Sequence, residues 1–198
     1  TLSEYDNVMV INDDVLKVDI RGLVEKENGG RPVKVVANLP YYITTDVLTK
    51  LMNELPRAQS IAVMIQKEVG DKLLSSPGED GYGPLAVMCQ YHYNVVRALD
   101  VPAACFNPPP KVDSSFMVLE RLETPYVDGG DEAVFTRLVR SAFAMRRKTL
   151  LNNLISGFAL NREQAASYLE AVGLSVQARA EELSLEDFAK LSRQLQSL

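Results

Sequence analysis

Two short apolar runs rich in β-branched residues, at 33–37 and 60–65, flank a segment with the spacing of an amphipathic helix. The apolar positions of that segment recur at helical intervals between Thr44 and Pro56, a span that opens on a possible N-cap residue and stops before a helix breaker. A further strand-like run lies at 8–11. Strands that alternate with helices in this way are typical of an α/β sheet with right-handed crossovers. The sequence therefore predicts an α/β domain with buried parallel strands.

Later runs predict how that sheet ends. A helical pattern at 66–74 follows the second strand, and two more apolar runs lie at 93–101 and 115–122. Only the proline-rich stretch 102–111 separates those two runs. A parallel crossover needs a dozen or more residues and usually a helix, so we expect an antiparallel pair at the edge of the sheet.

From about residue 124 the patterns are helical throughout. Helices are predicted at 131–145, from Asn161 to near Gly173, and after Ser184, which forms a capping box with Asp187. Leu183 and Phe188 have the spacing of a hydrophobic staple around that cap. We expect two domains, an α/β domain at 1–123 and a small all-α domain at 124–198.

Composition excludes several classes of protein. The 198 residues are 46% apolar and 24% charged, with a formal net charge of −5, which is the balance of an ordinary globular protein. No apolar stretch approaches the roughly 18 residues of a spanning helix. The N-terminus lacks the pattern of a secretion signal, so we expect a cytoplasmic protein with no membrane partner. Because Cys89, Cys105 and His92 are the only cysteines and histidine, we expect no metal site.

The segment Asn38-Leu39-Pro40-Tyr41 directly follows the strand-like run at 33–37. Ligands of open α/β sheets collect beyond the carboxyl ends of strands, so this turn is a candidate site. A carboxamide oxygen and a neighbouring backbone carbonyl can accept both N–H donors of an exocyclic adenine amine, and a tyrosine offers a face for stacking the base. The alternative is an ordinary Asn-Pro turn covered by a tyrosine.

Several motifs resemble those of one family. Residues 38–43 resemble the fourth motif of amino-methyltransferases in the version found in ribosomal RNA adenine dimethylases, and 106–114 resembles that family's later motif, a phenylalanine before a proline-rich turn and Lys-Val-Asp-Ser. Tyr42 makes the chain more similar to small-subunit dimethyladenosine transferases than to large-subunit resistance methylases. Further matching segments lie at 64–69, 82–85 and 146–154.

This resemblance implies a partial Rossmann-like class I methyltransferase sheet and a site for adenosine. Asn38 and the Leu39 carbonyl are expected to hold the target N6, Pro40 to fix the turn, and Tyr41 and Phe106 to sandwich the base. Taken without Tyr41, Phe106 is better explained as a loop aromatic that closes the domain junction.

The same resemblance implies the cofactor S-adenosylmethionine, with Asp14, Val15 and Asn38 as candidate contacts. Asp14 aligns with an aspartate that accepts the cofactor's adenine amine, although Asp13 stands where the family usually has glycine. No glycine-rich loop precedes Asp14. We expect a parent protein with further N-terminal strands and a cofactor loop, and weak or no cofactor binding by the chain as it stands.

Positive charge is concentrated between residues 131 and 160. If one helix ran unbroken through this segment, four of its basic side chains would share one face and Arg146 would oppose them. Such a stripe can neutralise RNA phosphates, although a solvated helix face is the plainer interpretation. The candidate RNA-binding residues are Arg137, Arg140, Arg146, Arg147 and Lys148.

The leading functional prediction is N6,N6-dimethylation of adjacent adenosines in small-subunit (16S) ribosomal RNA, with the 30S subunit as partner. One alternative is a non-catalytic RNA-binding module in ribosome assembly. A weaker alternative is a DNA adenine-N6 methyltransferase, because such enzymes share the Asn-Leu-Pro-Tyr chemistry.

Overall fold

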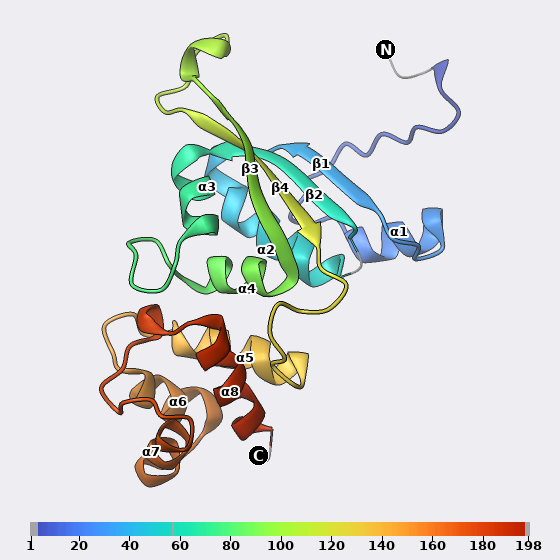
Figure 1. The fold of residues 1–198 in the computed structure, drawn as a ribbon. Helices are drawn as coiled ribbons and strands as arrows, with labels where there is room; N and C mark the ends of the chain where they lie inside the picture. The colour runs from blue at the N-terminus through green and yellow to red at the C-terminus, as the bar shows by residue number, and fades with distance from the viewer. Residues whose placement is uncertain (1–3, 57, 197–198) are drawn as a thin grey trace.

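A computed structural model describes residues 4–56 and 58–196, and it shows a four-stranded sheet above a group of helices (Figure 1). The sheet order is β1-β2-β4-β3. β1 and β2 are parallel, and β4 pairs antiparallel with both β2 and β3, so the predicted antiparallel pair at one edge is confirmed. The strands are β1 (Lys34–Asn38), β2 (Ser60–Gln66), β3 (Tyr93–Val101) and β4 (Ser114–Arg121).

Helices α1 to α4 accompany the sheet, and α5 to α8 form the helical part below it (Figure 1). The predicted N-cap Asn161 and the predicted capping box of Ser184 are both present, and Asn161 forms a capping box as well. The α-helices are α1 (Ile20–Asn28), α2 (Thr44–Glu54), α3 (Lys67–Leu74), α4 (Pro84–His92), α5 (Glu132–Ala142), α6 (Leu150–Phe158), α7 (Arg162–Ala171) and α8 (Leu185–Leu195), and the short 3-10 turns are η2 (Tyr41–Ile43), η3 (Ala103–Cys105) and η4 (Ala180–Glu182).

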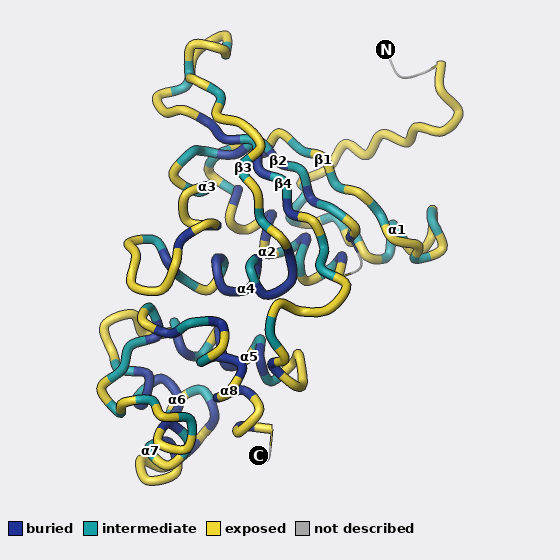
Figure 2. Tube along the Cα trace, viewed as in Figure 1, coloured by how far each residue is buried: buried dark blue, intermediate teal, exposed yellow. Residues whose placement is uncertain are grey.

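Two apolar clusters hold the fold together (Figure 2). One lies between the sheet and α2 to α4, and the other lies among α5 to α8. Helix α4 contributes to both, because Cys89 belongs to the first cluster and Tyr91 to the second. The Tyr91 ring stacks on Phe135 of α5 with centroids 3.9 Å apart. The domain boundary near residue 124 remains a prediction, and α4 is the helix through which the two clusters adjoin.

The structure departs from the sequence analysis in three places. Residues 8–11 form an exposed extended segment and not a strand, and within the described ranges they pair with no strand of the sheet (Figure 1). Helix α1 has no predicted counterpart; it begins after the N-cap Asp19 and ends at Gly29 in the left-handed conformation. Helix α4 also has no predicted counterpart, because it is buried on two sides and lacks a single apolar stripe.

Two surveys of the described residues bear on partners. No helix in the ranges 4–56 and 58–196 is both long and apolar enough to cross a membrane. Over the same ranges, histidine, cysteine and acidic side chains do not gather in threes in a way that could hold a metal ion.

Candidate active site

The candidate residues lie at one end of the strands, where the chain leaves β1 and β2. Asn38 pairs with Met64, Met64 with Phe116, and Phe116 with Leu99, so these four residues form one row across the strands. The row lies at the carboxyl ends of β1 and β2, which is the edge where open α/β sheets bind ligands. The Asn-Leu-Pro-Tyr turn and the β3–β4 loop both leave from this edge (Figure 1).

The turn after β1 is fixed by one buried side chain and three hydrogen bonds. Leu39 is 7% exposed and belongs to the α/β cluster, and its N–H donates to the Met64 carbonyl at 3.2 Å. The Pro40 carbonyl accepts from the Ile43 N–H and from the Thr44 hydroxyl, each at 3.2 Å. With Leu39 anchored inward, Asn38 is exposed beside it. The Asn38 carboxamide is therefore presented at the surface of the strand end.

Tyr41 is held at its far end. Its hydroxyl forms a 2.6 Å hydrogen bond with the hydroxyl of Ser114, the fully buried first residue of β4. The Tyr41 side chain is half-buried, whereas the neighbouring Tyr42 is 85% exposed. Two adjacent tyrosines thus have different environments, and the one expected to stack a base is the one that the fold restrains.

Phe106 lies on the β3–β4 loop, directly after η3. Its N–H donates to the Ala103 carbonyl at 3.1 Å, and the Ala103 N–H donates to the Asp113 carboxylate at 2.9 Å. The Asp113 carbonyl also accepts from the Lys67 N–H at 3.0 Å. The Phe106 side chain is half-buried. The Lys-Val-Asp-Ser motif therefore ties the loop that carries Phe106 to the same edge as Tyr41.

A polar network continues from this edge into β3. The Ser115 hydroxyl donates to Asp100 at 2.7 Å, and Lys67 lies 3.5 Å from the other carboxylate oxygen. The hydrogen bond from Ser115, assisted by the positive charges of Lys67 and Arg97, lowers the pKa of the Asp100 carboxyl. This network was not anticipated from the sequence, because it joins residues that only the antiparallel pairing of β3 and β4 brings together.

The expected cofactor residues lie on the loop before α1. Asp14 is exposed; one carboxylate oxygen accepts the Leu16 N–H at 3.0 Å, and the other lies 3.8 Å from the Lys17 ammonium. Val15 is partly buried against the cluster that contains Leu39. A carboxylate has about four lone-pair positions, so Asp14 can still accept an amine. The residues fit the adenine end of the cofactor, and residues 4–13 hold no glycine loop for its other end.

The condition for a shared basic face over 131–160, one unbroken helix, is not met. Helix α5 ends at Ala142 and α6 begins at Leu150, so the basic side chains before and after this break do not share a helix face. Arg137 donates to the Gly157 carbonyl at 2.9 Å and lies 4.5 Å from the centre of the Phe158 ring. Arg140 donates to the Asn53 side chain at 3.2 Å. These two arginines bind groups of the protein itself.

The remaining basic residues lie on the loop between α5 and α6. Arg146, Arg147 and Lys148 are all exposed there. Arg146 also borders a cleft of about 950 Å³ between the two parts of the molecule, together with Thr45, Phe143 and Glu181. The loop thus places positive charge next to the cleft.

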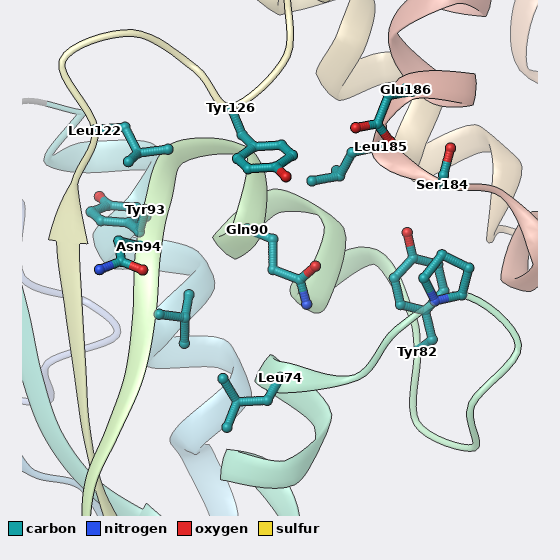
Figure 3. A pocket seen from close by; sticks show the side chains of 12 residues that line it. Leu74, Tyr82, Gln90, Tyr93, Asn94, Leu122, Tyr126, Ser184, Leu185 and Glu186 are labelled. Carbon is teal, nitrogen blue, oxygen red and sulfur yellow. The ribbon is translucent and has the colours of Figure 1, made fainter.

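A separate cavity of about 510 Å³ lies between β3 and the start of α8 (Figure 3). Its lining contains no predicted site residue. The Tyr82 hydroxyl donates to the Leu183 carbonyl at 2.9 Å, and the Gln90 amide donates to the carbonyls of Leu73 and Ser75. Because these polar groups hold neighbouring elements together, the cavity is a junction between the two parts and not a competing active site.

Comparisons with known proteins agree on one family. The model of the family described as ribosomal RNA adenine dimethylase matches residues 1–197. A protein named ribosomal RNA small subunit methyltransferase A from Clostridium acetobutylicum is 44% identical over 194 residues, which cover 98% of this chain and 69% of that protein. A protein of the same name from Bacillus mycoides is 45% identical over 199 residues, which cover 98% of this chain and 68% of that protein.

Solved structures show the same fold. A crystal structure of a dimethyladenosine transferase from Plasmodium falciparum superposes with a TM-score of 0.75 at 23% identity, covering 98% of this chain and 74% of that one. A crystal structure of the 23S rRNA methyltransferase ErmE superposes with a TM-score of 0.65 at 23% identity, and the match covers 98% of this chain and 75% of that one. The predicted class I methyltransferase fold is confirmed.

Proposed function

Because this chain belongs to the ribosomal RNA adenine dimethylase family, we propose that it serves S-adenosylmethionine-dependent N6,N6-dimethylation of adjacent adenosines in small-subunit ribosomal RNA. The family match over residues 1–197 and the two relatives named for the small subunit support this substrate. The observation that carries the chemistry is the exposed Asn38 carboxamide at the carboxyl end of β1, beside the anchored Leu39.

The proposed role of this strand end is to orient the target nitrogen. An exocyclic adenine amine is a poor nucleophile, because its lone pair is delocalised into the ring. When the Asn38 oxygen and the Leu39 carbonyl accept its two N–H groups, the lone pair is directed outward toward a methyl donor. Tyr41 and Phe106 stack the extruded base from its two faces and so offset the few kcal/mol that extrusion costs.

Cofactor use follows from membership of a methyltransferase family, and the residue roles are part of the proposal. S-adenosylmethionine supplies an electrophilic methyl group when it is bound. Asp14 accepts the adenine amine, Val15 packs beneath it, and Asn38 borders the methionine end. We propose that the 198 residues alone bind this cofactor weakly, because no glycine-rich loop precedes Asp14. A calorimetric titration with S-adenosylmethionine that gave micromolar affinity would contradict this.

The proposed partner is the 30S subunit in the cytoplasm. The exposed Arg146 borders the cleft between the two parts of the molecule, and the exposed Arg147 and Lys148 follow it on the same loop. Such a group can neutralise phosphates next to the base that enters the site. Arg137 and Arg140 use their donors to hold α6 and α2, so the proposed phosphate contacts rest on the three loop residues.

Methyl transfer to small subunits that lack dimethyladenosine tests the proposal. The assay uses a fusion that places the glycine-rich cofactor loop of a relative ahead of Thr1, together with labelled S-adenosylmethionine. Asn38→Ala is expected to lower the rate by about 10²-fold or more, since it removes an acceptor that orients the reacting nitrogen. Asn94→Ala is the matched control, because Asn94 is exposed on β3 and lines the other cavity.

Each alternative function has its own outcome in this assay. An Asn38→Ala fusion as active as the unchanged one rejects the assigned chemistry. Salt-sensitive binding to small subunits without any methyl transfer supports the assembly module. Transfer to duplex DNA at a rate equal to that on small subunits supports the DNA methyltransferase.

A further inference from the structure

Two adjacent residues, Asp113 directly before β4 and Ser114 at its start, hydrogen-bond to the two parts of the candidate site that carry its aromatic rings. Ser114 forms the hydrogen bond with the Tyr41 hydroxyl, and Asp113 accepts from the Ala103 N–H at the base of the Phe106 loop. Ser114 belongs to a strand that pairs with both β2 and β3. The Tyr41 ring and the loop that carries Phe106 are therefore both hydrogen-bonded at the start of β4.

The bond to Ser114 restrains Tyr41 in a particular way. A tyrosine ring is attached to the backbone through its Cβ, and here the opposite end is also fixed by the 2.6 Å hydrogen bond. With both ends of its long axis held, the ring cannot swing, and only its faces remain for contact. Ser114 itself is fully buried at the start of a paired strand, so it does not follow the ring. Fixing a stacking surface beforehand reduces the ordering cost of binding a base.

Hydrogen bonds also restrain the start of the loop that carries Phe106. The Asp113 side chain caps η3, its carbonyl binds the Lys67 N–H, and Phe106 follows η3 with its own N–H bonded to Ala103. The loop reaches well beyond the sheet (Figure 1). Without the Asp113 contact, the Ala103 N–H at the start of η3 would lose its acceptor, and the turn that leads to Phe106 would be less restrained.

We propose that Asp113 and Ser114 are positioning residues that set the separation and tilt of Tyr41 and Phe106, and that they thereby make the site selective for a flat, extruded purine base. This inference rests on the proposed function, which requires that an adenine base binds between the two rings. Neither residue contacts the reacting nitrogen. Their effect passes through the rings, so it appears in how well a base is stacked.

The test uses this chain and a short single-stranded RNA in which 2-aminopurine replaces one adenine. Stacking between two rings quenches this fluorophore, so the quench at saturating protein reports ring geometry separately from affinity. Tyr41→Phe keeps the ring and removes only the bond to Ser114, and Ser114→Ala removes the same bond from the other side. Each is expected to reduce the quench and to weaken binding by about three- to tenfold.

Pairs of variants separate positioning from stability. Tyr41→Phe combined with Ser114→Ala should be no weaker than either single variant, because both delete one interaction. Asp113→Asn retains an acceptor oxygen and should preserve the quench, whereas Asp113→Ala should reduce it. Tyr42→Phe is the matched control, since Tyr42 is exposed and is predicted to have no effect.

Three results would overturn the inference. The first is a full quench in Tyr41→Phe, a variant at a half-buried position that leaves the ring and the core packing in place. The second is additive losses in the double variant. The third is quenching by the unchanged chain that Ser114→Ala leaves intact, which rejects the positioning role while retaining the proposed function. If the fusion that carries the cofactor loop also fails to methylate small subunits, the proposed function fails as well.

Discussion

The sheet edge and the helical part of this molecule use their polar side chains in opposite ways. At the carboxyl end of β1 Asn38 is exposed, while Tyr41 and the Phe106 loop are held in place beside it. In the helical part Arg137 directs its donors to a carbonyl of α6 and its guanidinium to an aromatic ring. The side chain proposed to orient the substrate is thus one that the fold leaves exposed. Much of the positive charge among the helices instead stabilises the packing of those helices.

The largest expected effect tests whether these two parts are energetically one unit. Phe135→Ala deletes a fully buried ring that stacks on Tyr91 of α4, the helix that borders both apolar clusters. We expect the free energy of unfolding to fall by about 3–5 kcal/mol. Urea unfolding followed by tyrosine fluorescence and by circular dichroism should give coincident transitions.

Val36→Ala is the matched truncation at the sheet edge. Val36 is 77% exposed on β1, so its loss should change stability by less than about 0.5 kcal/mol. If Phe135→Ala gave separate transitions by tyrosine fluorescence and by circular dichroism, with only the circular dichroism transition shifted, α4 would not couple the two parts.

A smaller effect concerns pH at the junction. Burial, assisted by the positive charge of Arg121, lowers the pKa of His92 to about 4. The ordinary value is about 6.5, so on acidification the unfolded chain takes up a proton before the folded chain does. The contribution to stability is complete above about pH 6.5 and is lost as the pH falls toward 4. Between pH 7 and pH 5 we expect a loss of about 1–2 kcal/mol.

The local contacts of His92 act in opposite directions. Its Nδ1 is buried without a hydrogen-bond partner among the described residues, which favours a neutral ring, whereas the Glu132 carboxylate 3.4 Å from Nε2 favours a protonated one. Denaturation curves of His92→Gln at pH 7 and pH 5 provide the comparison, since this variant cannot titrate there. If it lost as much stability on acidification as the unchanged chain, His92 would not be the source.

The sequence predicted those parts of the fold that depend on neighbouring residues. The apolar spacing of α2 and the strand character of β2 are local patterns, and both are found where they were expected. The caps of α7 and α8 are local as well. Helix α4 escaped prediction because its neighbours on two sides are apolar, and residues 8–11 were misassigned because β-branched composition alone does not supply a pairing strand.

The candidate site divides along the same line. Asn38 was identified because it directly follows a strand, which is a local signal. The hydrogen bond between Tyr41 and Ser114 joins residues 73 positions apart, and it depends on β4 lying next to β2 in the sheet. No spacing within the sequence specifies that adjacency. The end of α5 was predicted at 145 and lies at Ala142, and α6 had no predicted counterpart.

A local cap offers a direct contrast with those long-range contacts. The Asn161 side chain accepts the Gln164 N–H at 2.8 Å, and the Gln164 side chain accepts the Asn161 N–H at 2.9 Å. Asn161→Ala should cost about 1 kcal/mol, because it leaves an N-terminal amide of α7 without its acceptor. Asn161→Asp preserves an acceptor and should remain near the unchanged stability. Thermal unfolding measures both, and equal losses would mean that side-chain capping is not the cause.

The smallest effect comes from Arg147, which is compared with Arg137, the arginine that contacts α6. Arg147 is exposed on the α5–α6 loop, outside the contacts that hold α5 to α6. Arg147→Ala should leave stability within about 0.5 kcal/mol, weaken binding to small-subunit RNA by about two- to fivefold, and lower the salt slope by about one. Arg137→Ala should instead lower stability by about 1 kcal/mol, since it removes the contacts to Gly157 and Phe158.

Filter binding over a range of salt concentrations, alongside urea unfolding, distinguishes these two arginines. The contrast between the two parts of the molecule requires that Arg147→Ala affects RNA more than stability and that Arg137→Ala does the reverse. If Arg137→Ala instead changed the salt slope without changing stability, its guanidinium would bind phosphate in preference to the α6 carbonyl. The helical part would then expose its charge for a ligand as the sheet edge exposes Asn38, and the distinction between them would fail.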